Sequence, residues 1–149
     1  MNTAADLLKT KHKKDNFIAK DATLQQAAQL MFTINCPYLV VMDGGDLKGL
    51  FTEHDYLRLV AYRGWDPSII KVQEAMTRDL PCVEMEDDVK EVLKTMVAHH
   101  THYVPVFHGH QFEGVISTDT IINGFMEPEL KSDYQQDTYV LDYDQVMKH

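Results

Sequence analysis

The sequence predicts a mixed α/β (α+β) fold in which two β-α-β-β-α repeats pack as a pseudo-two-fold pair. Residues 7–60, shifted by 65 positions, align with residues 72–125 without a gap. Along both copies, the spacing of apolar residues changes in the same order from strand-like to helix-like. Because there are only two copies, a solenoid or propeller is excluded and a symmetric pair is favoured. The chain has 149 residues, which can bury one good core, whereas one copy alone is marginally stable, so the copies should share a core.

The residues that are identical between the copies fall where backbone geometry is demanding. They lie in a predicted helix, at the start and middle of a predicted strand, in the turn that follows it and at the start of the next strand: Met31/Met96, Tyr38/Tyr103, Val41/Val106, Gly44/Gly109 and Gly49/Gly114.

The first copy is predicted to contain a strand over 16–20, a helix with one apolar face, a hairpin around the turn 43–46 and a helix over 53–63. Apolar residues three, four and seven positions apart form one face of a helix, and Asp21 or Thr23 supplies its N-cap. Short β-rich runs on both sides of a Gly-containing turn are typical of a hairpin. The second copy repeats this order with a strand over 81–85, a helix from Val89, a hairpin around 108–111 and a helix over 118–126.

Chain-breaking residues and charge set the predicted boundaries. Gly64–Pro67 interrupt the pattern and mark a linker, which gives residues 1–70 for repeat one with its linker and 71–126 for repeat two. Residues 127–149 form an acidic C-terminal tail with two basic and six acidic residues. Its apolar residues, among them Tyr139 and Val146, are expected to dock part of the tail on the core or on another subunit.

Composition excludes several classes of function. The chain carries 14 basic and 23 acidic residues, a net charge of −9, and no clustered basic face that would bind nucleic acid. No apolar run approaches the roughly 18 residues of a membrane helix, and the N-terminal segment lacks the apolar stretch of a secretory signal, so we expect a soluble, cytoplasmic protein with no membrane partner. Cys36 and Cys82 have no CxxC spacing and are expected to be reduced thiols used as small hydrophobes.

Thr52 and Asp55 stand where a predicted strand runs directly into a predicted helix. A hydroxyl residue followed three positions later by an acidic one is the pattern of a capping box, in which both side chains satisfy free backbone N–H groups. The same turn can also hold a nucleotide, with a phosphate near the helix N-terminus and the ribose hydroxyls on the acid.

Two repeats that each end in Gly-apolar-apolar-Thr/Ser, with Tyr103-Val-Pro-Val-Phe107 in a middle strand, resemble the paired domains named after cystathionine β-synthase (CBS), also called a Bateman module. The similarity covers residues 5–126. The stretch Thr52–Tyr56, followed by Arg63-Gly64 and Val72–Asp79, resembles the small stand-alone bacterial pairs.

This resemblance implies a regulatory module, not an enzyme, that binds an adenosine ligand such as AMP, ADP, ATP, NAD(H) or S-adenosylmethionine, with no obligatory metal. Ligand binding would change its conformation or association and so act on a partner protein that the sequence does not name. In this family the acid of the motif takes the ribose and the Ser/Thr assists near the phosphate or ribose. The residues implied for one site are Thr52, His54, Asp55, Cys82, Val83, His102, Tyr103 and Pro105.

The matching motif of the second repeat departs from the family pattern. Ser117 is kept, but Thr120 stands where the acid is expected, and Asp119 lies one residue early. A helix turns about 100° per residue, so Asp119 points in another direction. Pro37 and Val40 also stand where the other copy has His102 and Pro105. We therefore expect one competent site and one degraded site at Ser117 and Thr120.

Other chemistry finds less support in the sequence. Five histidines fall between residues 99 and 110, and neutral imidazoles are common metal ligands, but their places at a helix end and in a turn explain most of them. No catalytic constellation or phosphate-binding loop is visible. A ligand-free dimerisation scaffold stays open as the second interpretation and a metal-binding protein or metal-dependent enzyme as the third. Apolar residues on both faces of the helix over 53–63 suit a homodimer.

Overall fold

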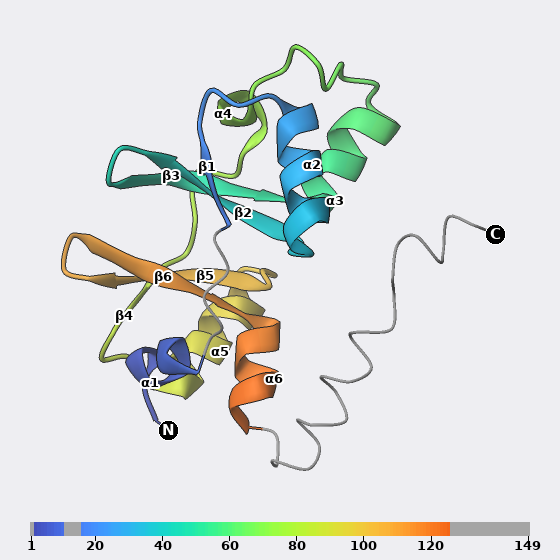
Figure 1. Ribbon diagram of the computed structural model, residues 1–149. Helices are drawn as coiled ribbons and strands as arrows, with labels where there is room; N and C mark the ends of the chain where they lie inside the picture. Colours follow the sequence, from blue (N-terminus) through green and yellow to red (C-terminus); the bar gives the residue numbers. More distant parts are fainter. Residues whose placement is uncertain (1, 11–15, 126–149) are drawn as a thin grey trace.

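The structure is a computed structural model that describes residues 2–10 and 16–125. Within these residues two three-stranded sheets face each other, with helices on their outer sides (Figure 1). The strand orders are β1-β2-β3 and β4-β5-β6; in each sheet the first strand runs parallel to the second, and the last two form an antiparallel hairpin. The predicted mixed α/β pair of repeats is confirmed.

Repeat one consists of β1 (Phe17–Ala19), α2 (Leu24–Ile34), β2 (Tyr38–Asp43), β3 (Asp46–Thr52), α3 (Glu53–Tyr56) and the π-helix η1 (Leu57–Tyr62). Of the two predicted caps of α2, Thr23 is the one used: its hydroxyl accepts the Gln26 N–H at 3.2 Å, and the Gln26 side chain accepts the Thr23 N–H at 3.0 Å. The predicted helix over 53–63 is present, but its second half is wound as a π-helix.

Repeat two consists of β4 (Val83–Glu84), α5 (Val89–Ala98), β5 (Tyr103–His108), β6 (Gln111–Ser117) and α6 (Thr118–Phe125). The first strand of each repeat is shorter than predicted, three residues against 16–20 and two against 81–85. Each lies at a sheet edge, and a turn closes directly behind it: the Ala22 N–H donates to the Ala19 carbonyl, and the Asp87 N–H donates to the Glu84 carbonyl.

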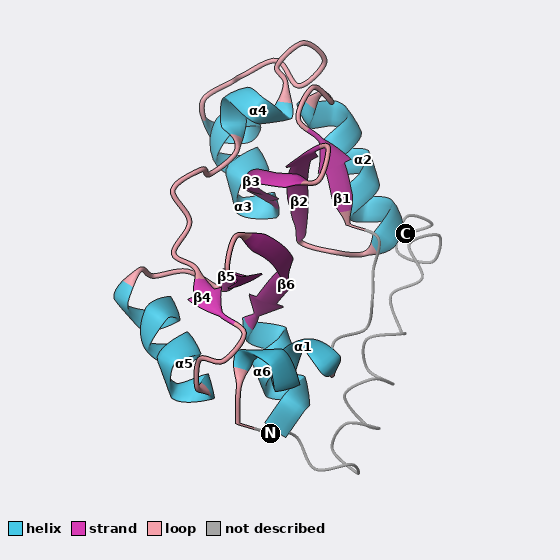
Figure 2. Ribbon diagram, turned by 90° about the vertical axis from the view of Figure 1, so that its left-hand side faces the viewer, coloured by secondary structure: helices cyan, strands magenta, loops and turns pink. Residues whose placement is uncertain are grey.

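A short helix precedes the first strand of each repeat and lies on the other repeat. α1 (Ala4–Lys9) packs in the core of repeat two, and α4 (Val72–Ala75) packs in the core of repeat one. Figure 1 shows the blue α1 beside α5 and α6, and Figure 2 shows α4 beside α3. The sequence pattern did not predict these two helices, because segments of six and four residues are too short to show a helical period.

The backbone contacts of these helices correct the predicted alignment of the repeats. The Ala4 N–H donates to the Asp87 carbonyl, and the Val72 N–H donates to the Ala22 carbonyl, both at 2.8 Å. The acceptors are 65 positions apart, but the donors are 68 apart. The ungapped offset of 65 is therefore wrong for the opening helices and holds from β1 onward. The extra residues lie in a connection, where a change of length costs little.

Among residues 2–10 and 16–125, apolar side chains gather in three clusters. The core of repeat two is built from α1, β4, α5, β5 and β6, and that of repeat one from α2, β2, β3, η1 and α4. The third cluster joins the inner faces of the two sheets and contains Cys36, Tyr38, Val40, Leu50 and Val115, with Tyr103 and Phe112 packed against it. The repeats share this third core, as the small size of each copy predicted.

The tail over 127–149, and the docking predicted for it, lie outside the described residues. Among the helices that the structure does describe, none has the length and apolar character needed to cross a membrane.

Candidate functional site

The turn between β3 and α3 joins Thr52 and Asp55 by two reciprocal hydrogen bonds. Thr52 ends β3 in an extended conformation, with φ −118° and ψ 163°. Its Oγ1 accepts the Asp55 N–H at 3.1 Å, and Asp55 Oδ2 accepts the Thr52 N–H at 3.0 Å. This arrangement is a capping box, so the purely structural role predicted for the motif is present in the molecule.

The Asp55 carboxylate is buried and has a second partner. The residue is only 7% exposed, and its Oδ1 lies 3.5 Å from Nη2 of Arg58. A carboxylate offers about four acceptor positions, and the Thr52 N–H and Arg58 use two of them. These two contacts thus leave about two acceptor positions of the Asp55 carboxylate unused.

The turn between β6 and α6 repeats the cap without the charge. The Ser117 N–H donates to Thr120 Oγ1 at 3.2 Å, the Thr120 N–H donates to Ser117 Oγ at 3.2 Å, and the two hydroxyl oxygens are 3.0 Å apart. Thr120 is buried like Asp55, whereas Asp119 is exposed. The two turns thus form the same pair of cap hydrogen bonds and differ in whether the buried side chain is a carboxylic acid or a hydroxyl.

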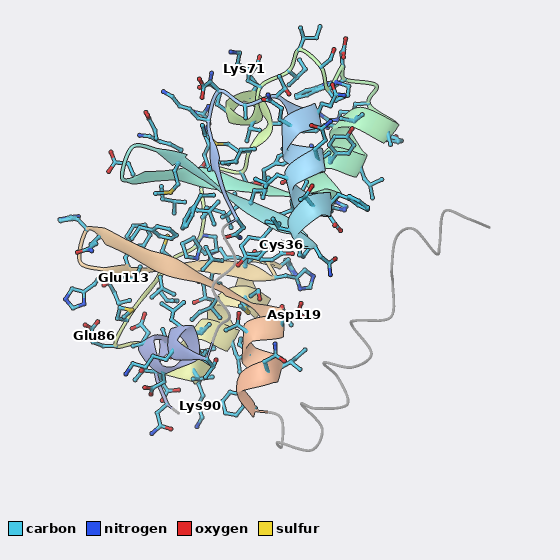
Figure 3. The ribbon with its side chains drawn as sticks, in the orientation of Figure 1. Cys36, Lys71, Glu86, Lys90, Glu113 and Asp119 are labelled. Atoms are coloured by element: carbon cyan, nitrogen blue, oxygen red, sulfur yellow. The ribbon has the colours of Figure 1, made fainter. Side chains whose placement is uncertain are left out.

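Both turns lie beside one pair of tyrosines. Tyr38 is in register with Thr52 in the first sheet, and Tyr103 is in register with Ser117 in the second. The two rings pack together with their centroids 4.5 Å apart. Figure 3 labels Cys36 and Asp119 at this helix-bearing end of the two sheets. The beginnings of α3 and α6 therefore flank the tyrosine pair.

Burial of Tyr38 and Tyr103 raises the pKa of both side chains. Burial raises the pKa of Tyr103 to about 12, and negative charge on Cys36, Asp119, Glu53 and Asp55 would act in the same direction. Burial likewise raises the pKa of Tyr38, while a hydrogen bond with the Asn16 side chain acts against that rise. Tyr103 of repeat two packs against Tyr38, which is in register with Thr52, so the structure brings Tyr103 near the turn that carries Thr52 and Asp55.

The other residues predicted for the site in repeat two differ in burial: two are buried and two are exposed. Pro105 is buried in β5 opposite Val115, a member of the core shared by the sheets. The Val83 side chain packs in the core of repeat two, so only its backbone could face a ligand. His102 is exposed, and its Nδ1 lies 3.3 Å from Thr118 Oγ1 of its own repeat. Cys82 is exposed, with Sγ 3.2 Å from the Leu80 carbonyl oxygen.

The family model for the CBS domain matches this chain twice, over residues 4–62 and 72–127. The chain belongs to the CBS domain family. CBS-domain proteins are generally regulatory and ligand-binding rather than catalytic. The second match begins 68 positions after the first, which agrees with the offset between α1 and α4.

Individual CBS-domain proteins support this assignment. The mitochondrial CBS domain-containing protein CBSX3 of Arabidopsis thaliana is 25% identical over 147 residues, covering 93% of this chain and 71% of that protein. A solved protein with CBS domains from Burkholderia ambifaria MC40-6 is 28% identical, with a TM-score of 0.76 over 83% of this chain and 93% of the other. A CBS-domain-containing protein of Agrobacterium tumefaciens shares the fold at 24% identity, with a TM-score of 0.75 over 83% and 99% of the chains.

The histidines of this CBS pair are spread over separate elements. His99 caps the C-terminus of α5, His100 follows it with a positive φ of 50°, and His108 Nδ1 lies 3.7 Å from Glu86 Oε1. Within the described residues no group of three or more His, Cys, Asp or Glu side chains is arranged to hold a metal ion. His54 is exposed on α3, between Glu53 and Asp55.

The sequence correctly predicted the burial of one of the two cysteines and missed two polar residues near the site. Cys36 is buried as expected, but Cys82 is exposed, because β4 directs its neighbour Val83 into the core instead. Partial burial, with the Glu84 carboxylate nearby, raises the pKa of the Cys82 thiol. Asn16, buried beside Cys36, and Arg58 were not predicted. The spacing of three residues between Asp55 and Arg58, which brings helical side chains together, was the available signal for the latter.

Proposed function

We propose that this CBS pair is a regulatory sensor of an adenosine nucleotide, with one competent site at the turn that carries Thr52 and Asp55. One observation carries the proposal: two turns with the same cap hydrogen bonds flank one tyrosine pair, and only one of them holds a buried carboxylate. A carboxylate accepts both hydroxyls of a ribose, whereas the Thr120 hydroxyl offers far weaker acceptors.

In this proposal the ribose hydroxyls donate to Asp55, and Thr52 and the exposed His54 lie toward the phosphates. Tyr103 and Pro105 of the second repeat supply apolar surface for the base, with His102 and Cys82 at the exposed edge and Val83 contributing backbone. The candidate ligands are AMP, ADP, ATP, NAD(H) and S-adenosylmethionine, without an obligatory metal. Binding would join the two repeats through one ligand and so change their relative packing, which a partner protein could read.

A thermal-shift screen of these five ligands and of divalent metals tests the proposal. A ligand present at about 100 times its dissociation constant stabilises the folded protein by about 2.7 kcal/mol. We expect a shift with at least one adenosine ligand in the parent protein and a clearly smaller shift in Asp55→Asn, which keeps a side-chain oxygen for the Thr52 N–H. A shift with metals alone, or none with any nucleotide, would contradict the proposal.

A ligand-free scaffold is the second candidate, because the cap and Arg58 already satisfy Asp55. Both candidates include self-association. Apolar residues at equivalent positions of the two repeats are exposed on the outer helices: Phe32 and Val97, 58% and 74% exposed, and Leu57 and Ile122, 60% and 45% exposed. Exposed apolar patches of this kind mark association surfaces. We infer a homodimer formed through these helices.

A further inference from the structure

The Asp55–Arg58 ion pair has no counterpart in repeat two. Asp55 corresponds to Thr120, and Arg58 corresponds to Asn123, so both charges are replaced by neutral side chains. The helical winding differs at the same place. The Arg63 N–H donates to the Arg58 carbonyl at 3.1 Å, five residues back, within the π-helix η1, whereas α6 stays α-helical through Asn123. Isolated π-turns are frequent at functional sites.

Repeat two serves as an internal control for what the turn needs in order to fold. Ser117 and Thr120 form both cap hydrogen bonds at 3.2 Å without any charge. The backbone of the turn therefore requires neither the Asp55 carboxylate nor a cation beside it. The ion pair of repeat one must be explained by something other than the cap.

Each oxygen of the Asp55 carboxylate has its own partner. The Thr52 N–H fixes Oδ2 at 3.0 Å, and Arg58 Nη2 faces Oδ1 at 3.5 Å. The terminal torsion of an aspartate is otherwise broad, so a single hydrogen bond leaves the plane of the carboxylate poorly defined. The Arg58 contact adds a second restraint on the orientation of that plane. The Arg58 side chain is 40% exposed and that of Asp55 10%, so Arg58 is the more exposed partner of the pair.

We propose that Arg58 is a positioning residue, which orients the Asp55 carboxylate to accept two neighbouring hydroxyl groups of the ligand. The inference rests on the function proposed above and deepens it: the site would select ligands with a free 2′,3′-diol. Arg58 acts through Asp55 and contributes to affinity only when the ligand has hydroxyls for Asp55 to accept. A direct contact between Arg58 and a phosphate is a different role, which the test below separates.

The test uses AMP, adenosine and 2′,3′-dideoxyadenosine monophosphate as probes, with calorimetric titration of the full chain. Arg58→Met is expected to weaken AMP binding by roughly two- to fivefold, the range of a partly exposed ion pair, and Arg58→Lys to restore part of the loss. The same Met variant should leave the weaker binding of the dideoxy ligand unchanged. Asp55→Asn combined with Arg58→Met should bind AMP no more weakly than Asp55→Asn alone. Asn123→Met, at the equivalent position of repeat two, should bind AMP as the parent does.

The outcomes separate this inference from the proposed function. If the parent protein binds AMP and Arg58→Met binds it equally well, the inference is wrong and the proposed function stands. Equal weakening of AMP and its dideoxy form, with adenosine unaffected, would show a phosphate contact and overturn the positioning role. Failure of the parent protein to bind AMP and adenosine would overturn the inference, and the proposed function would then depend on the four remaining ligands of the thermal-shift screen. Thermal melting of each variant without ligand shows whether it folds. If Arg58→Met does not fold, AMP binding by Arg58→Lys is measured in its place.

Discussion

Tyr38 and Tyr103 occupy equivalent positions in the two repeats, and their rings lie against each other with centroids 4.5 Å apart and planes inclined by 37°. Each tyrosine opens the middle strand of its sheet. A residue that meets its own equivalent marks the pseudo-two-fold axis, so the axis passes through this pair. The contact also shows why neither repeat is complete alone, because removing one repeat would expose the tyrosine of the other.

The tyrosine pair predicts a loss of stability at alkaline pH. A tyrosine in the unfolded chain ionises near pH 10, whereas the pKa of Tyr103 is raised to about 12 in the folded protein and that of Tyr38 is also raised. Between these values the folded state holds more protons than the unfolded state, so the free energy of unfolding falls as pH rises. The stabilisation is fully present below pH 10, and the part due to Tyr103 is lost as pH rises through about 12. Urea unfolding at pH 8, 10 and 11 measures this slope.

Tyr103→Phe is the matched variant for the alkaline effect. It keeps the ring contact and removes one ionising group, so its stability should fall less steeply above pH 10 than that of the parent. Other groups titrate in the same range but are common to both proteins. Equal slopes in the two proteins would contradict the assigned pKa shift.

The two turns predict one binding site per chain. A charge-assisted hydrogen bond contributes about 1.5–3 kcal/mol, so Asp55→Asn should weaken adenosine-nucleotide binding by roughly tenfold to a hundredfold. Thr120→Ala should leave affinity unchanged, although it removes a cap hydrogen bond. Calorimetry of the parent should give one site per chain. Two equivalent sites, or full affinity in Asp55→Asn, would show that the assignment of a competent and a degraded turn is wrong.

The sequence determined local elements well and long-range placement poorly. The hairpins around 43–46 and 108–111, and the cap formed by Thr52 and Asp55, follow from short-range chemistry and are present in the structure. The packing of α1 on repeat two and of α4 on repeat one depends on contacts with residues far along the chain, which no local pattern encodes. The orientation of Val83 could not be predicted either, since a two-residue strand is too short to show alternation.

Alanine substitution should affect stability very differently at Gly49 and at Gly45. Leu50 exchanges backbone hydrogen bonds with Thr77, which brings that segment onto β3, and a Cβ on Gly49 would lie 2.5 Å from the Thr77 carbonyl oxygen and 2.9 Å from Met76 Sδ. Gly49→Ala should therefore destabilise the protein by about 1–3 kcal/mol. A Cβ on Gly45 meets nothing within 4 Å, so Gly45→Ala should change stability by less than about 0.5 kcal/mol. Similar unfolding midpoints for the two variants would contradict the close approach.

Because α1 packs in the core of repeat two, a substitution in α1 should weaken repeat two. Leu7 is fully buried in the core of repeat two although it precedes repeat one in sequence. Leu7→Ala should cost about 2–5 kcal/mol, and native-state hydrogen exchange should speed up first in α5 and β5. Ile69→Ala, at a side chain that is 67% exposed, is the control and should have little effect. Faster exchange confined to α2 and β2 would show that α1 does not support repeat two.

The exposed helix residues predict a dimer that a charge can dissociate. Leu57 and Ile122 lie at equivalent positions of the two repeats, so a second copy with the same pseudo-symmetry would cover both at once. Light scattering at micromolar concentration should give twice the chain mass for the parent. Leu57→Lys combined with Ile122→Lys should give the monomer, because burying two unpaired ammonium groups at an interface is unfavourable. Ile69→Lys adds one charge at an exposed apolar residue outside these helices and should stay dimeric. A monomeric parent, or a dimer that survives the paired substitution, would place self-association elsewhere or exclude it.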